Sequence, residues 1–522
     1  MQTQMLRPIF KLVSYNKEFV RSAAVASAAV KSPTETANLK SWKDIPGPSS
    51  LPIIGTLHHF LTGSINIVND LDATQKLYDK FGLIVRLEGP LGMPPMILLG
   101  DPETTEQVLR GENWMPLRPG FPSLEYYRKV YKKKKGNTYK ATGIITDHGE
   151  VWKEFRSTVN PVMLQPKTIK LYSNVLDEVA QDMIERMKSI RDEKNMIQQD
   201  FDIQMNLWAL ESIGTVALGI RLNCFDPNLA VDSPERQLIQ CIHDLFLMAD
   251  KLDYKPGIWK FVTTPMYRKA MKLYERQEEK QASSLEFHLS INFFRLTRHF
   301  IRKGMKELDK NSANEKGVLA KLVEIDEEVA VIMASDMLFA GVDTAANTMS
   351  GILYLLATNP EKQEKLREEI LSKSERKPYL KACVKESMRL MPVVSGNMRK
   401  TTKEYNLMGY RIPKDMSVIF SHRDMSLMDS QYPRAKEFIP ERWIADVNDP
   451  LYYKNAHPFA NAPFGFGVRS CIGRRIAELE VETFLARIIE NFRVEWIGPP
   501  PKVVQTALIY VKGPFNYIFK DV

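Results

Sequence analysis

The sequence predicts a single large domain that is mainly α-helical, and two observations support this prediction. Helical patterns recur along the chain: residues 149–156 are amphipathic, residues 331–357 form a long apolar run, and residues 474–489 follow helical spacing. In addition, no Pro/Gly/Ser-rich linker, low-complexity tract or internal repeat interrupts residues 45–522. A length of 522 residues would allow two or three domains, but the uninterrupted stretch favours one.

The composition is that of an ordinary globular protein, with 44% hydrophobic and 26% charged residues. The four cysteines, with no CxxC spacing, favour a reducing compartment over secretion. The formal net charge of +9 falls to about +5 without residues 1–31. This is too modest for nucleic-acid binding without a focused basic patch, so we expect no nucleic-acid partner.

Residues 1–31 are basic, rich in Ser and Ala, and almost free of acids. Five basic residues face one acid, Glu18, and no apolar run reaches the roughly 18 residues that a membrane span requires. The pattern predicts a mitochondrial transit peptide and leader over residues 1–40, the alternative being an uninformative disordered tail. The basic residues are Arg7, Lys11, Lys17, Arg21 and Lys31.

Two further stretches have helical spacing. Trp152 and Arg156 lie four residues apart, so both can donate hydrogen bonds to one carboxylate from the same helix face. Residues 281–315 repeat apolar side chains at helical spacing with arginine and lysine alongside. That stretch is either an ordinary packed helix or a basic amphipathic face that touches a membrane surface.

The apolar run at 331–357 carries an embedded acid and alcohol, Asp343 and Thr344. A buried charge in such a run is costly unless it has a partner or a function. Gly341 weakens the helix locally, and a threonine hydroxyl can bond the carbonyl one turn back, so we expect a kink here. The alternative is a capping Asp-Thr pair in a core helix.

Charged residues also mark the helix that we expect around residues 381–389. Glu386 and Arg389 share one face of it, which alone is a weak signal because any solvated helix can carry such a pair. Lys381 and Lys385 lie four residues apart on the same helix.

The most informative segment is residues 464–473. Cys471 can ligate iron as a thiolate, and the helix expected to start after it stabilises negative charge on sulfur. Gly467 and Gly473 leave room for a flat macrocycle, Arg469 suits a haem propionate, and Phe464 can exclude water from the sulfur. The competing interpretation is a buried structural cysteine in a glycine-rich turn.

This segment resembles the haem-binding signature of the cytochrome P450 superfamily, and the resemblance covers roughly residues 45–522. Residues 45–48 resemble the proline-rich hinge that opens the catalytic domain of the family. The resemblance implies a fold that is mainly α with small β-sheets (α+β), in one catalytic domain that encloses haem. The implied cofactor is haem b, iron protoporphyrin IX with Cys471 as the axial thiolate.

The resemblance also implies roles for individual residues. Asp343 and Thr344 would relay protons for oxygen activation, although Ala345 stands where many relatives carry a second hydroxyl. Glu386 and Arg389 would form a buried triad with Arg442, fixing the loop that carries the cysteine. Trp152, Arg156, Arg399 and Arg469 would bind the propionates, and Ala340, Val393, Val394 and Thr506 would line an apolar pocket.

In mitochondrial members of this family, paired lysines at the positions of Lys381 and Lys385 dock an acidic redox partner. With Arg474 and Arg475 they would form a cationic patch near the thiolate. The implied partners are an adrenodoxin-type [2Fe–2S] ferredoxin and its NADPH-dependent reductase. The implied location is the matrix side of the mitochondrial inner membrane, with peripheral membrane association.

The function expected from this resemblance is a haem-thiolate monooxygenase that inserts one oxygen atom of O₂ into an apolar small molecule. Overall similarity is greatest to insect mitochondrial detoxification members, which favours a xenobiotic such as an insecticide. A steroid or ecdysteroid hydroxylase is the alternative within the same clan. An oxygen-independent isomerase is disfavoured by Asp343 and Thr344, and a haem sensor or carrier would need neither a proton relay nor a docking surface.

Overall fold

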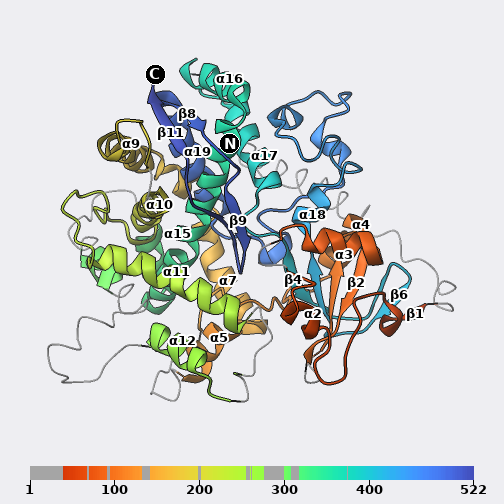
Figure 1. Ribbon diagram of the computed structural model, residues 1–522. Helices are drawn as coiled ribbons and strands as arrows, with labels where there is room; N and C mark the ends of the chain where they lie inside the picture. Colours follow the sequence, from red (N-terminus) through yellow and green to blue (C-terminus); the bar gives the residue numbers. More distant parts are fainter. Residues whose placement is uncertain are drawn as a thin grey trace, which may run out of the picture.

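In the computed structural model of the protein, the described residues form mainly helices, accompanied by small sheets (Figure 1). The predicted leader lies almost wholly outside the described residues, as does most of the stretch 281–315. The structure describes residues 39–66, 70–90, 94–131, 141–197, 201–253, 259, 262–275, 299–306, 317–372 and 374–522.

The helices carry the larger of the hydrophobic cores. Their bounds are α2 Leu57–Leu61, α3 Ala73–Phe81, α4 Pro102–Arg110, α5 Pro122–Tyr126, α7 Gly149–Met163, α8 Pro166–Lys170, α9 Ser173–Ile190, α10 Phe201–Leu218, α11 Pro234–Leu252, α12 Pro265–Glu275, α14 Val318–Ile325, α15 Glu327–Ala357, α16 Pro360–Leu371, α17 Pro378–Leu390, α18 His422–Ser426 and α19 Arg474–Asn491. Shorter helical segments are η3 Trp42–Asp44, η5 Tyr127–Tyr131, η7 Pro440–Trp443, η8 Tyr453–Asn455 and η9 Gly467–Arg469.

The strands form sheets in the orders β2-β3-β7-β4, β1-β6-β5, β10-β9 and β11-β8. All pairings are antiparallel except β3 with β7 and β1 with β6. The strands are β1 Lys40–Ser41, β2 Ile84–Leu87, β3 Met96–Leu99, β4 Asn397–Lys400, β5 Tyr405–Leu407, β6 Tyr410–Ile412, β7 Ser417–Phe420, β8 Phe492–Trp496, β9 Lys502–Gln505, β10 Ile509–Lys512 and β11 Tyr517–Asp521.

The sheets β2-β3-β7-β4 and β1-β6-β5 lie beside the helical part and have smaller cores of their own (Figure 1). The proline-rich entry packs onto this part: the carbonyl of Pro46 accepts a hydrogen bond of 2.9 Å from the amide of Arg86 on β2. A Cβ at Gly47 would collide with the carbonyl oxygen of Arg86. The entry is therefore fixed against β2 rather than standing free as a hinge.

Helix α15 is the central element of the helical part. It begins four residues earlier than the apolar pattern indicated, because the Asp326 side chain caps it by accepting from the amide of Val329 at 3.0 Å. It is long and apolar enough to cross a membrane, but 72% of its most apolar window is buried within the protein. The environment of α15 is thus that of a core helix.

Gly341 has a packing role that the sequence did not indicate. The helix runs without interruption from Glu327 to Ala357, and α10 packs closely along it. A Cβ at Gly341 would lie 2.7 Å from Cγ1 of Ile213 on α10, so glycine here permits close helix packing. The hydroxyl of Thr344 does bond one turn back, to the carbonyl of Ala340 at 2.6 Å.

Within the stretch 281–315, the structure describes residues 299–306, and these residues are helical. Phe300 and Ile301 are buried in the main core, whereas Arg302 and Lys303 are exposed. This part of the stretch is therefore a packed amphipathic helix.

Candidate functional site

The segment that carries Cys471 is a tight loop leading into α19. The amide of Cys471 donates to the carbonyl of Phe464 at 2.8 Å, and Gly465 and Gly467 both have φ of +70°. That backbone conformation is costly for residues with a Cβ, which explains both glycines locally. The loop ends at Gly473, directly before α19 begins, as the sequence predicted.

The thiol of Cys471 is accessible, but the surrounding protein desolvates it. Burial raises the pKa of this thiol, and the amide of Gly473 together with Arg156, Arg118 and Arg474 opposes the rise. Burial outweighs these opposing groups, so the surroundings by themselves favour the neutral thiol.

A cluster of guanidiniums lies near this cysteine, and those of Arg156, Arg399 and Arg469 are buried. Arg469 stacks on the ring of Trp152 with its guanidinium carbon 3.6 Å from the ring centroid. Its nitrogens donate to the carbonyls of Pro116 at 3.0 Å and Asp147 at 3.1 Å. Burial, followed by the positive charges nearby, lowers the pKa of Arg469 to about 9.

The other members of the cluster are Arg118, Arg156 and Arg399. Arg156 donates to the carbonyl of Ser470 at 3.0 Å, and burial lowers its pKa to about 10. Arg399 pairs with Glu112 at 2.7 Å, and burial lowers its pKa as well. The carboxylate of Glu112 acts on two of these guanidiniums, those of Arg399 and Arg469, and opposes the lowering of their pKa values.

Guanidinium groups remain charged in proteins. The repulsion within such a cluster is therefore reduced by binding anionic groups rather than by losing protons. Two buried donors point to the same requirement. The Nε1 of Trp152 and the Nε of Arg156 have no hydrogen-bond partner in the part of the chain that the structure describes. The donor set fits a ligand that brings carboxylates, which is what the two propionates of haem supply.

The cysteine stands without metal-binding neighbours. Across the described residues, no group of three or more His, Cys, Asp or Glu side chains could hold a bare metal ion. An iron bound at Cys471 must therefore bring most of its ligands with it, as the iron of a porphyrin does.

A second charged cluster lies on α17 and the loop that follows α18. The carboxylate of Glu386 accepts from Arg389 at 2.8 and 2.9 Å and from Arg442 at 3.1 Å. It also accepts from the indole of Trp443 at 2.9 Å and from the amide of Ile439 at 3.1 Å. The triad geometry that the sequence analysis expected is present, with two further donors.

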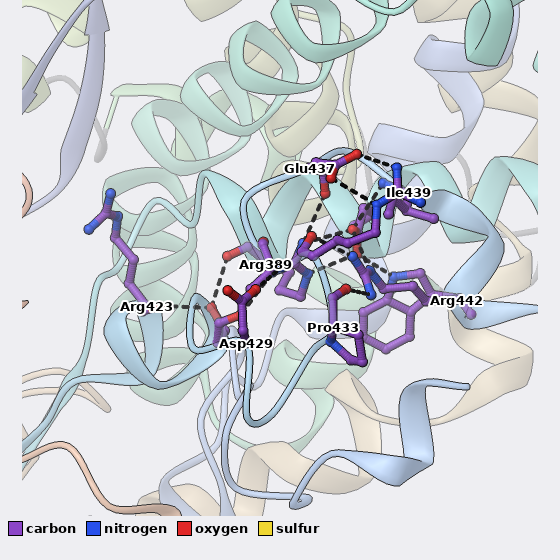
Figure 2. A network of polar contacts seen from close by, with 12 residues as sticks. Arg389, Arg423, Asp429, Pro433, Glu437, Ile439 and Arg442 are labelled. Carbon is purple, nitrogen blue, oxygen red and sulfur yellow. Dashed lines mark hydrogen bonds and ion pairs between the residues drawn. The ribbon is translucent and has the colours of Figure 1, made fainter. Parts of the chain in front are cut away.

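The two guanidiniums of this triad also hold the backbone around them (Figure 2). Arg389 donates to the carbonyls of Ser426 and Ala435, and Arg442 donates to that of Arg434 at 2.7 Å. These contacts fix residues 426–443. The triad therefore orders the segment that precedes the cysteine loop in the chain, rather than bonding to that loop through the contacts described.

The acid and the alcohol on α15 have different environments. Thr344 is half-buried and shares a helix face with Ala340, which is exposed although it lies in the middle of a core helix. The carboxylate of Asp343 is buried and accepts from the hydroxyl of Tyr510 on β10 at 2.9 Å. The accessible face of α15 thus carries the hydroxyl, and the carboxylate lies against β10.

Four exposed cations lie on two helices that pack together, Lys381 and Lys385 on α17 and Arg474 and Arg475 on α19. Arg474 pairs with Glu478 at 2.9 Å. Both lysines lie near Glu482, whose pKa burial raises and the lysines partly lower again. The patch is cationic, and the two carboxylates reduce its charge.

Sequence reasoning missed several residues of these clusters. Arg118 and Glu112 lie in irregular chain between α4 and α5, where no periodicity marks a residue. Trp443 stands beside Arg442 in the sequence, and an aromatic N–H next to a triad arginine could have suggested its role. Nothing in the sequence pairs Tyr510 with Asp343 across 167 residues.

Comparison with known proteins identifies the family of the chain. Residues 45–519 match the family model of cytochrome P450. Cytochrome P450 CYP12A2 of Musca domestica is 37% identical over 517 residues, which cover 94% of each chain. Probable mitochondrial cytochrome P450 12a5 of Drosophila melanogaster is 32% identical, covering 95% of this chain and 94% of the relative.

Probable mitochondrial cytochrome P450 12b2 of the same fly is 33% identical over 90% of this chain and 87% of the relative. Among solved structures, retinoic acid-bound cyanobacterial CYP120A1 has the same fold, with a TM-score of 0.68 at 19% identity. The match covers 93% of this chain and all of that one. The chain therefore belongs to the cytochrome P450 family, whose members are haem-thiolate monooxygenases.

Proposed function

We propose that this protein is a mitochondrial monooxygenase that oxidises an apolar xenobiotic with electrons from a [2Fe–2S] ferredoxin. The observation that carries the proposal is the combination of an exposed Cys471 with a desolvated thiol and, near it, buried guanidiniums and two buried donors without partners in the described chain. Three relatives whose names call them mitochondrial match almost the whole chain and support the compartment.

Cys471 is the iron ligand in this proposal, and the bound haem supplies the capacity to activate O₂. Arg156, Arg399, Arg469 and Trp152 bind the propionates, joined by Arg118, whose positive charge acts on all three of these arginines. Gly467 and Gly473 allow the loop to approach the macrocycle. Phe464, which stacks under the guanidinium of Arg474 at 5.3 Å, shields the sulfur.

Thr344 and Asp343 provide the protons that oxygen activation consumes. Thr344 orients water on the accessible face of α15, and Asp343 delivers protons from the side of β10. The two residues therefore act from different faces of one helix.

The substrate is apolar in this proposal because the accessible pocket candidates are mostly aliphatic. Ala340 and Val394 are exposed, and the segment of Val393 is joined to that of Thr506 by the hydrogen bond from the amide of Ile509 to the carbonyl of Val393 at 2.8 Å. A steroid or ecdysteroid fits this description as well, and the xenobiotic is preferred because the sequence most resembles insect mitochondrial detoxification members.

The first experiment binds candidate substrates to the purified protein that lacks residues 1–40. Insecticides and steroids are compared by the shift each causes in the Soret band, and by product formed with ferredoxin, its reductase and NADPH. Preferential shifts and turnover with insecticides support the proposal. Turnover restricted to steroids or ecdysteroids would support the alternative function, a steroid or ecdysteroid hydroxylase. A normal haem spectrum without turnover, whichever electron donor is supplied, contradicts an enzymatic role.

The redox partner is tested by reversing the charge of the α17 lysines. Lys381→Glu with Lys385→Glu should abolish ferredoxin-driven turnover at low ionic strength, because charge reversal turns steering into repulsion. Peroxide-driven turnover should survive. Ferredoxin-driven turnover that persists at low salt would mean that these lysines are only a solvated helix face.

Localisation is tested by fusing residues 1–40 to a fluorescent reporter. Mitochondrial import is expected from the basic, acid-poor composition. Protease protection in isolated mitoplasts, with carbonate extraction of the full-length protein, then checks the matrix side and peripheral attachment to the inner membrane.

A further inference from the structure

Asp343 is held by residues from two other elements, and one of them connects it to the surface. Its side chain is only 1% exposed, and its Oδ2 accepts from the hydroxyl of Tyr510 at 2.9 Å. The same oxygen lies 3.8 Å from Nδ1 of His243 on α11, whose side chain is 30% exposed. His243 thus has one ring nitrogen near the buried carboxylate while part of its ring reaches solvent.

Tyr510 fixes the position of this carboxylate. Burial, and then the charge of Asp343, raise the pKa of the Tyr510 hydroxyl far above its ordinary value, so the phenol remains a donor. Its ring meets that of His243 edge-on, with centroids 5.8 Å apart and planes at 86°. Tyr510 therefore orients both the carboxylate and the imidazole.

The second carboxylate oxygen has a different status. The Oδ1 of Asp343 has no hydrogen-bond partner among the described residues, although it is fully buried. A buried carboxylate oxygen without a donor is costly unless it takes up and passes on a proton. Tyr510 therefore holds Oδ2 of Asp343, while Oδ1 remains available for a further hydrogen bond.

The other charged groups around this pair are few. From α11 the acidic side chain of Asp250 acts on Tyr510, and it lies seven residues after His243 on the same helix face. From β10 the ammonium group of Lys512 lies 4.8 Å from the ring centroid of Tyr510. Neither comes between His243 and Asp343 in the contacts described.

We propose that His243 is the solvent-side proton donor to Asp343, with Tyr510 as the positioning residue for both. The inference rests on the proposed monooxygenase function and adds the route by which its protons arrive. Imidazole suits this step because one ring nitrogen can release a proton while the other takes one up. Rotation of either side chain, or one bridging water, closes the gap of 3.8 Å.

The proton balance is set by the overall reaction, in which R–H, O₂, two electrons and two protons give R–OH and water. Ferredoxin supplies the electrons, and solvent supplies the protons. At His243 an N–H bond breaks as an O–H bond forms on the carboxylate of Asp343. The opposite ring nitrogen then regains a proton from solvent, so His243 is not consumed.

The test is oxygen consumption by the substrate-free holoenzyme, driven by ferredoxin and reductase, in H₂O and in D₂O. His243→Gln keeps polar nitrogen and oxygen atoms near the carboxylate but cannot shuttle a proton. It should slow oxygen consumption by about tenfold and raise the solvent isotope effect. The control Gln240→Ala changes an exposed residue of the same helix and should leave both unchanged.

A second comparison separates proton supply from damage to the site. Peroxide brings its own protons, so the peroxide-driven dealkylation of 7-ethoxyresorufin should be equal in His243→Gln and wild type. The double variant His243→Gln with Asp343→Asn should be no slower than Asp343→Asn alone, because both residues act in one path. Tyr510→Phe should give a smaller loss than either.

The proposal is overturned if His243→Gln has the rate and isotope effect of wild type, or if it loses peroxide-driven activity as well. If ferredoxin is not the electron donor, the result is different, because the wild-type protein itself then consumes no oxygen with ferredoxin. In that case a diflavin reductase replaces ferredoxin as donor, and the same comparison of His243→Gln with wild type decides the proposal.

Discussion

Two charged clusters, the triad around Glu386 and the guanidiniums around Arg469, differ in how their charges are satisfied. In the triad, the carboxylate of Glu386 accepts from two guanidiniums, one indole and one amide. In the cluster around Arg469, neighbouring guanidiniums lower one another's pKa values, Glu112 acts on two of them, and two buried donors lack partners within the described chain.

This difference distinguishes a structural cluster from a ligand-binding one. The triad needs nothing from outside the chain, because its arginines also donate to several backbone carbonyls. The guanidinium cluster has unsatisfied donors as protein alone, and burial, followed by neighbouring positive charges, lowers the pKa values of Arg156 and Arg469. Haem, with two carboxylates, completes it.

The largest expected effect is at the iron ligand that the incomplete cluster surrounds. Cys471→Ser should abolish the absorption band of the reduced carbon-monoxide complex typical of thiolate haem, because a hydroxyl is a poor iron ligand. Cys383→Ala is the matched control, since Cys383 is buried on α17 and burial raises its pKa, which keeps it an inert thiol. A normal band in Cys471→Ser would refute the site.

The next effect tests whether the triad is self-sufficient. Glu386→Gln leaves two buried guanidiniums without their carboxylate and should lower the free energy of unfolding by about 3–5 kcal/mol. Urea unfolding of the holoenzyme, followed by circular dichroism, measures this. Glu437→Gln, which breaks an exposed pair with Arg434 in the same loop, should leave the midpoint unchanged. Equal midpoints for the two variants would remove the distinction between the clusters.

The comparison also explains what could be predicted from sequence. The triad was predicted because Glu386 and Arg389 share a helix face and Arg442 follows in a recognisable segment. The segment that the triad holds in place, residues 426–443, was not predicted. Its contacts with the arginines run through backbone carbonyls, which no side-chain pattern reveals. Arg118 escaped prediction because irregular chain has no period, whereas the helix beginning at Arg474 has one.

A smaller effect is expected within the guanidinium cluster. Arg156→Gln removes a charge-assisted bond to a propionate, so haem should transfer to excess apomyoglobin about tenfold faster. The urea midpoint should change much less than in Glu386→Gln, because removing one charge relieves repulsion among the remaining arginines. Arg493→Gln, at an exposed pair with Glu364, is the control. A large loss of stability with unchanged haem transfer would make Arg156 a structural residue instead.

The smallest and sharpest effect compares one indole from each cluster. The N–H of Trp443 donates to Glu386 at 2.9 Å, whereas the buried N–H of Trp152 has no partner in the described residues. Trp443→Phe loses a bond to a charged acceptor, and the free energy of unfolding should fall by about 2 kcal/mol with little direct effect on haem transfer. Trp152→Phe loses no bond within the protein.

For Trp152→Phe the main change should therefore be faster haem transfer, by severalfold, because the bond that is lost is the one to a propionate. Both variants remove the same atoms from the side chain. The ratio of the haem-transfer rate to the unfolding midpoint therefore separates a role in haem binding from a role in protein stability. The ratio should rise in Trp152→Phe and stay near the wild-type value in Trp443→Phe. If both indoles changed stability and haem transfer in the same proportion, the two clusters would form one structural network, and the excess of positive charge near Cys471 would need a different explanation.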